Sequence, residues 1–217
     1  MNIRDFFLDL IYPPRCPFCR NLLRDNEADI CARCLRTLPF VPPDEQPVSY
    51  PFIKLCVAPL YYEGSVRDSL LRYKFGGVTA YKKAYADLLS KCIDENNISC
   101  DIITWVPLSR KRLQRRGYDQ ARLLAEDMAD TMAVPCERLL NKVRDNPPQS
   151  GTSGVEMRRK NVIGVYTCAS ETALENKRVL IIDDIVTTGS TLKECARMLL
   201  AAGADVVYAA AVARSHN

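Results

Sequence analysis

The sequence predicts an α/β fold with a largely parallel sheet and flanking helices, preceded by a small cysteine-rich module. Two observations predict the sheet. Short apolar, β-branched runs alternate with longer segments of helical periodicity, which is typical of parallel strands joined by crossover helices. The clearest apolar run, residues 179–182, ends at the adjacent carboxylates of Asp183 and Asp184. A third observation, two C-x-x-C pairs near the N-terminus, indicates the separate module.

The composition fits one domain of ordinary size with a small appendage, because the chain has 217 residues and 47% of them are apolar. A formal net charge of +4 leaves a nucleic-acid role open without requiring one. Apolar runs fall short of the ~20 residues that span a bilayer. The first ten residues contain acids and lack a signal-peptide layout, so we expect a cytoplasmic protein.

The first element, residues 2–11, has the periodicity of an amphipathic helix that ends at Pro13. Three surfaces fit its apolar face: the protein's own body, a helix of a partner, or a membrane surface touched from one side. The face consists of Ile3, Phe6, Phe7, Leu10 and Ile11.

The four cysteines that follow have the spacing of a structural zinc site. Eleven residues separate the first C-x-x-C pair from the second, and four thiolates form a closed tetrahedral site. The alternative is a redox C-x-x-C, but the βαβ surroundings of that motif are not recognisable here. We therefore predict a helix and zinc module over residues 1–38, a proline-rich linker over 39–51 and the main domain over 52–217. The zinc ligands would be Cys16, Cys19, Cys31 and Cys34.

The elements of the main domain follow from periodicity and from proline and glycine stops. Ligands of such parallel sheets bind beyond the carboxyl ends of the strands, where Pro107 and the two acids fall. The pattern predicts strands at 55–62, 101–107, 179–182 and 205–212, and helices at 64–75, 79–96, 117–132 and 192–200.

A loop of small hydroxyl residues follows the two acids and opens a helix. Its N–H groups and the helix dipole would hold a phosphate. The stretch from Val179 to Leu192 resembles the phosphoribosyl pyrophosphate (PRPP) binding motif of type I phosphoribosyltransferases. The resemblance implies that Asp183 and Asp184 hold the ribose hydroxyls with Mg²⁺. It also implies that the 5′-phosphate binds to Thr187, Thr188, Gly189, Ser190 and Thr191.

A basic run follows the predicted strand at 101–107. Arginine suits phosphate oxygens because its planar fork binds them bidentately. We predict a loop that cradles a pyrophosphate, while a solvated basic helix face is the alternative. The residues of this predicted loop are Pro107, Leu108, Ser109, Arg110, Arg112 and Arg116.

No catalytic residue is assigned. Purine-salvage enzymes carry an acid at the position of Thr187, and a hydroxyl cannot replace a carboxylate near pH 7. An orotate-type enzyme would use a loop lysine, for which Lys111 is the candidate.

Residues 142–161 are rich in Pro, Gly, Ser and Thr and lack an apolar stripe. We predict a long mobile loop that covers the site and excludes water.

Together these motifs resemble the ComF family over nearly the whole chain. The resemblance rests on the four cysteines, the segment Tyr73-Lys74-Phe75-Gly76-Gly77, the basic run with Arg116 to Gln120, the residues Gln149, Arg159 and Asn161, and the PRPP motif. It implies a phosphoribosyltransferase fold used in competence, the uptake of single-stranded DNA during natural transformation.

Three functions remain open. In the first, the chain binds PRPP with magnesium, and its basic run and zinc module contact single-stranded DNA or a helicase partner. Stacking surfaces beside that charge would come from Tyr73, Phe75 and Tyr118. In the second, it is an active phosphoribosyltransferase with an unknown acceptor. In the third, it is a zinc-stabilised adaptor with a vestigial site.

Overall fold

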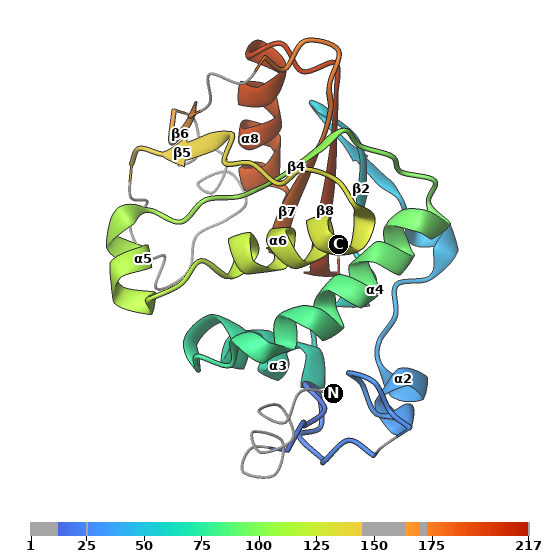
Figure 1. Ribbon diagram of the computed structural model, residues 1–217. Coiled ribbons are helices and arrows are strands. Elements are labelled where there is room, and N and C mark those ends of the chain that lie inside the picture. Colours follow the sequence, from blue (N-terminus) through green and yellow to red (C-terminus); the bar gives the residue numbers. More distant parts are fainter. Residues whose placement is uncertain (1–12, 25, 145–163, 170–172, 217) are drawn as a thin grey trace.

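A computed structural model describes residues 13–24, 26–144, 164–169 and 173–216 (Figure 1). The predicted N-terminal helix at 2–11 lies outside the described residues. So does most of the predicted loop at 142–161, with Gln149, Arg159 and Asn161.

The largely parallel sheet is confirmed. Its strands lie in the order β1-β2-β8-β7-β4, and β3 also pairs with β8. Within this sheet the strands pair in parallel, except that β1 and β2 are antiparallel. The strands are β1 (Val48–Tyr50), β2 (Ile53–Val57), β3 (Leu60–Tyr61), β4 (Ile102–Trp105), β7 (Arg178–Val186) and β8 (Val206–Arg214).

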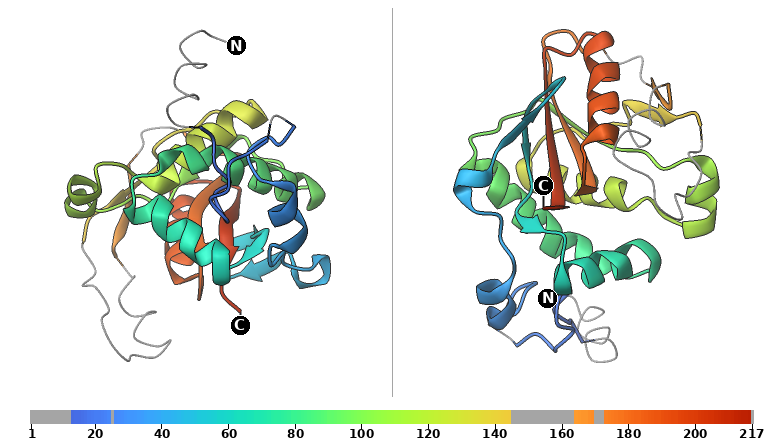
Figure 2. Two further views of the ribbon diagram at one scale, coloured as in Figure 1. Left: turned by 90° about the horizontal axis from the view of Figure 1, so that it is seen from below. Right: turned by 180° about the vertical axis from the view of Figure 1, so that it is seen from behind.

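Helices cover both faces of the sheet (Figures 1 and 2). One apolar core joins a sheet face to α3 (Gly64–Phe75), α4 (Lys82–Glu95) and α6 (Gln120–Met132). The other joins the opposite face to α8 (Ser190–Ala201). Shorter elements are α2 (Ala32–Thr37), η1 (Pro43–Glu45), η2 (Thr79–Tyr81), α5 (Arg110–Arg116), β5 (Leu140–Lys142) and β6 (Tyr166–Cys168).

Several sequence predictions need correction. The predicted linker at 39–51 contains η1 and β1, and β1 forms an edge of the main sheet. The strand predicted at 55–62 is divided into β2 and β3 around Pro59. The helix predicted at 117–132 begins at Gln120, because Gly117 has φ of 82° and ends α5. Strands β5 and β6 pair antiparallel and were not predicted.

A bidentate ion pair joins the amino ends of β4 and β7. Arg178 donates from its guanidinium to both carboxylate oxygens of Asp101, with N–O distances of 2.7 and 3.1 Å. The Arg178 backbone N–H also donates to Asp101, at 2.8 Å. These bonds hold the pKa of Asp101 well below its usual range.

Asp101→Asn is expected to lower the melting temperature at pH 7 by about 2–4 °C. A carboxylate with a depressed native pKa stabilises the fold above the unfolded pKa of about 3.9, and that stabilisation is lost as the pH falls below it. The difference between wild type and variant, followed by thermal unfolding, should therefore shrink below about pH 4. A difference that stays constant down to about pH 2 would contradict the assigned role.

Candidate ligand site and metal centre

The two predicted ligand-binding segments leave the sheet side by side. Trp105 of β4 is the register partner of Ile182 of β7, and the Val106 N–H donates to the Ile182 carbonyl at 3.0 Å. Pro107 and Asp183 are the next residues of their segments. The sheet therefore places the start of the basic run beside Asp183 and Asp184, here called the acid pair, at one edge, as the strand pattern predicts.

The acid pair faces both sides of the sheet, because successive side chains of a strand alternate. On the side of α3, the Lys74 ammonium lies 2.7 Å from a carboxylate oxygen of Asp184. The Asp184 side chain is 4% exposed. Burial disfavours the charged amine, but Asp184 and Asp183 outweigh it and raise the pKa of Lys74. Lys74 is therefore a cation at neutral pH.

Asp183 belongs to the side of α8. Its charge helps to raise the pKa of Cys195 on α8, for which burial is the larger cause. Burial and the neighbouring Asp184 charge raise the pKa of Asp183 well above its ordinary value. A second cation or a metal ion beside Asp183 would reverse that shift.

Two motifs that lie far apart in the sequence meet beside Asp184. The Tyr73 hydroxyl donates to the Gln120 carbonyl at 2.8 Å, and the Tyr118 hydroxyl donates to the Tyr73 carbonyl. The Arg116 guanidinium donates to the Gln120 side chain and lies 4.8 Å from the centroid of the Phe75 ring. The segments Tyr73–Gly77 and Arg116–Gln120 therefore form one wall.

The contacts within this wall change which of the predicted aromatic side chains can stack on a ligand. Tyr73 is fully buried and cannot offer a ring face to a ligand. Phe75 is 65% exposed and keeps that capacity, beside Arg116. Burial is also the main cause that raises the pKa of Tyr73, so its hydroxyl stays neutral.

The basic run is a helix and not the predicted loop. Ser109 caps α5 by accepting the Arg112 backbone N–H at 3.3 Å. The turn before it is fixed by the buried Asp119, which accepts the Leu108 N–H at 3.0 Å and caps α6. Pro107 and Ser109 are buried, whereas Arg110 and Lys111 are exposed.

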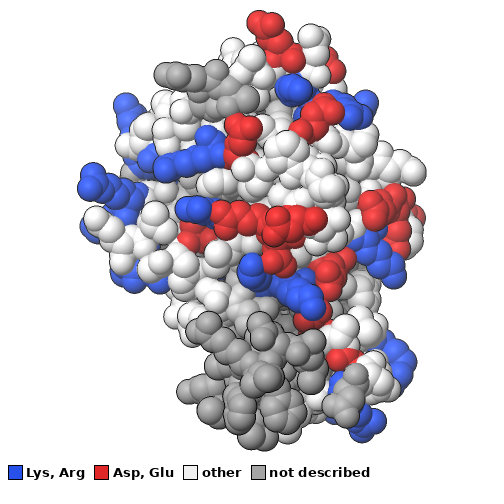
Figure 3. All heavy atoms as spheres, in the orientation of Figure 1, with Lys and Arg blue, Asp and Glu red and all other residues white. Residues whose placement is uncertain are grey.

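Basic side chains gather around α5, which lies at the left of the face shown in Figure 3. A cavity of about 320 Å³ lies between α5 and the end of β5. Its lining residues are Ser109, Arg110, Lys111, Gln114, Lys142, Val143 and Arg144. An anion of phosphate type would meet several donors there.

The hydroxyl loop opens α8 as predicted. Gly189 has φ of 66°, and the helix begins at Ser190. The Thr188 and Ser190 hydroxyls lie 2.8 Å apart, and Thr187 is exposed. Tyr50 of β1 packs on this loop, because a Cβ at Gly189 would lie 3.2 Å from its ring. Sequence reasoning missed Tyr50, since its strand was interpreted as linker.

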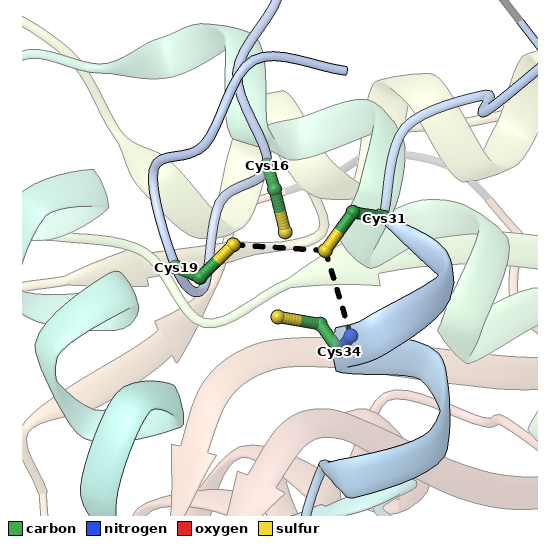
Figure 4. A group of neighbouring side chains, drawn as sticks. All are labelled: Cys16, Cys19, Cys31 and Cys34. Carbon is green, nitrogen blue, oxygen red and sulfur yellow. Dashed lines mark hydrogen bonds between the residues drawn. The ribbon is translucent and has the colours of Figure 1, made fainter. Parts of the chain in front are cut away.

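The four predicted zinc ligands converge (Figure 4). Their sulfur atoms all lie within 4.8 Å of one another, and those of Cys19 and Cys31 are 3.6 Å apart. A tetrahedral site with Zn–S bonds of about 2.3 Å has sulfur atoms about 3.8 Å apart, so the cluster fits zinc. All ten cysteines are free of disulfide bonds.

Two known domain families match successive parts of the chain. The double zinc ribbon domain matches residues 7–48, and the phosphoribosyl transferase domain matches residues 119–217. Competence protein F of Haemophilus influenzae is 33% identical, over 51% of this chain and 48% of that protein. Competence protein ComFC of Bacillus subtilis is 29% identical, over 65% of this chain and 56% of that protein. The two matched domains and these relatives support a ComF-family protein.

The chain has a phosphoribosyltransferase-like α/β fold, and the geometry of its N-terminal four-cysteine module supports structural zinc. It spans about half the length of the curated relatives it matches. A glutamine PRPP amidotransferase of B. subtilis is 22% identical with a TM-score of 0.42, covering 64% of this chain and 30% of that chain. Among the described residues, helices fall short of the length and apolarity needed to cross a membrane.

Proposed function

We propose that this ComF-family chain binds PRPP with Mg²⁺ at the carboxyl ends of β4 and β7. The observation that carries the proposal is that the acid pair of β7 leads directly into the hydroxyl loop that opens α8. Asp183 and Asp184 lie among the last four residues of β7, and Gly189 and Ser190, five and six residues after Asp184, open α8. A sugar with a phosphate at one end and vicinal hydroxyls at the other fits this sequence of donors and acceptors.

Each part of the ligand would meet a group of suitable chemistry. Carboxylate oxygens of the acid pair suit ribose hydroxyls and Mg²⁺, which prefers hard oxygen ligands. The ion would neutralise the pyrophosphate and favour its departure if the sugar is transferred. The 5′-phosphate would lie on residues 187–191, and the pyrophosphate on residues 107–109 and Arg116. Lys111, on the exposed face of α5, is the candidate for a catalytic lysine.

A role in natural competence follows from the relatives that are named competence proteins. The basic surface around α5 would contact the backbone of single-stranded DNA, and the exposed Phe75 ring would stack on a base. The zinc module would offer a further contact for DNA or for a helicase. The protein would act in the cytoplasm, where incoming single strands arrive.

Isothermal titration calorimetry with PRPP and Mg²⁺ tests the pocket. Heat of binding that requires Mg²⁺ is the expected result, and absence of heat would refute the proposal. Pyrophosphate release over a panel of nucleobases and amines then separates a binding protein from a transferase.

Replacing Arg110 and Lys111 by Ala is expected to weaken single-stranded DNA binding and to flatten its salt dependence. Each phosphate contact on a single strand contributes about 0.7 to the slope of log K against log salt, so two lost contacts lower the slope by about 1.4. Fluorescence anisotropy over a salt series measures this.

The matched control is Lys54→Ala/Lys91→Ala, which removes the same charge from β2 and α4. Equal slopes for wild type and the α5 variant would remove α5 as a DNA contact.

A further inference from the structure

Helix α3 lies between the cysteine cluster and the acid pair. Its residues Ser69 and Arg72 both contact the first cysteine knuckle, which is the turn formed by residues 16–19. The Ser69 hydroxyl donates to the Pro17 carbonyl at 2.7 Å, and the Arg72 guanidinium donates to the same carbonyl at 2.8 Å. Pro17 stands between Cys16 and Cys19, so these bonds hold the turn that carries two of the four sulfur atoms.

The contact is buried and continues onto α4. Pro17 and Ser69 are both buried, and the Ser69 hydroxyl also lies 2.6 Å from that of Tyr85. The Phe18 ring packs edge-on against Tyr85, with 6.1 Å between centroids. Hydrogen bonds shielded from water in this way fix geometry more firmly than exposed ones.

The next turn of α3 reaches the ligand site. Tyr73 follows Arg72 directly and donates to the Gln120 carbonyl. Lys74 pairs with Asp184 at 2.7 Å. Ser69 and Lys74 are five residues apart, which is about 7.5 Å along a helix. A helix is stiff over so short a distance, so a shift at one end moves the other.

We propose that the first cysteine knuckle positions α3, and that α3 thereby positions Lys74 against Asp184, so that the metal centre sets the geometry of the acid pair. Lys74, Ser69 and Arg72 are positioning residues in this proposal. The ligand involved rests on the proposed function, whereas the mechanical coupling does not depend on it.

Gly76 supports a fixed length for α3. Its N–H donates to the Arg72 carbonyl at 2.7 Å, and a Cβ at this position would lie 2.8 Å from that oxygen. The helix ends at Phe75 with Gly76 as its C-cap, and Arg72 is tied to both the knuckle and this helix end.

The test compares the full-length zinc-loaded protein with the variant Ser69→Ala/Arg72→Met. The matched control is Ser65→Ala/Arg67→Met, which makes the same substitutions at exposed positions of α3. Two further variants, Ser69→Ala alone and Lys74→Met, are measured in parallel. For each protein we measure bound zinc, thermal unfolding, amide hydrogen exchange in residues 70–77 and 183–190, and affinity for Mg²⁺ with PRPP.

All four variants are expected to retain zinc. The Ser69→Ala/Arg72→Met variant should exchange about tenfold faster in both segments and bind PRPP about tenfold more weakly, a change of about 1.4 kcal/mol. Lys74→Met should speed exchange in residues 183–190 and leave the knuckle unchanged. A fifth variant, Lys74→Arg, keeps the positive charge and should retain the wild-type exchange rate in residues 183–190. The control should match wild type.

Wild-type exchange in residues 183–190 of the Ser69→Ala/Arg72→Met variant would overturn the coupling. If that variant fails to fold, exchange in residues 183–190 of the Ser69→Ala variant alone decides whether the coupling exists. If wild type binds no PRPP, the proposed function fails, but the exchange data still decide whether the knuckle positions the acid pair.

Discussion

Asp183→Asn is expected to lower the affinity for PRPP with Mg²⁺ by at least about 100-fold, because hydrogen bonds to a charged acceptor contribute about 1.5–3 kcal/mol each. The substitution keeps the shape of the side chain and removes its charge. Asp183 lies on the α8 side of β7, where burial and the neighbouring Asp184 charge raise its pKa and a compensating positive charge would lower it. A ligand that brings Mg²⁺ supplies that charge. Calorimetry at fixed Mg²⁺ measures the change.

The neighbouring Asp184→Asn separates two roles within the acid pair. Asp184 is already paired with Lys74, so its loss removes a ligand contact and also releases the lysine. We expect weaker PRPP binding together with a lower melting temperature, whereas Asp183→Asn should spare or raise the melting temperature by relieving a buried charge. The control is Asp205→Asn, at the turn before β8. Unchanged affinity in Asp183→Asn would remove the acid pair from the site.

The elements that were predicted correctly carry their signal locally. Residues 179–182 are all buried in β7, because an apolar run of β-branched residues suits a strand covered on both faces. The cysteine spacing and the hydroxyl loop are local as well. Strands β1, β5 and β6 have three residues each, and such short strands form only where a partner strand is present. Their sequences alone could not reveal the partner.

Residues that meet across the fold were the hardest to predict. Lys74 and Asp184 are brought together by the packing of α3 against the sheet, and Tyr50 reaches Gly189 only because β1 joins the sheet edge. Helix α5 is different, because its signal was present: Ser109 is a good N-cap, and Gly117 is a good C-terminal stop. The clustered charge led to the prediction of a loop.

Cys16→Ser is expected to abolish stoichiometric zinc binding and to lower the free energy of unfolding by at least about 4 kcal/mol. Metal-binding energy is folding energy in a module too small to have its own core. Cys16 is fully buried, and its knuckle belongs to the same apolar core as α3 and α4. Loss of the metal should therefore destabilise the whole domain as well as the module. Metal analysis of freshly purified protein and denaturant unfolding measure the two effects.

The control is Cys168→Ser, on β6 and outside the cluster, which should keep one zinc and near-wild-type stability. Purification under reducing conditions excludes a disulfide as the source of any difference, because a structural metal persists where a disulfide is reduced. A Cys16→Ser protein with a full equivalent of zinc would show that three thiolates and another ligand suffice. A wild type with less than half an equivalent would refute the metal centre, and the knuckle would then have to be held by its bonds to α3 alone.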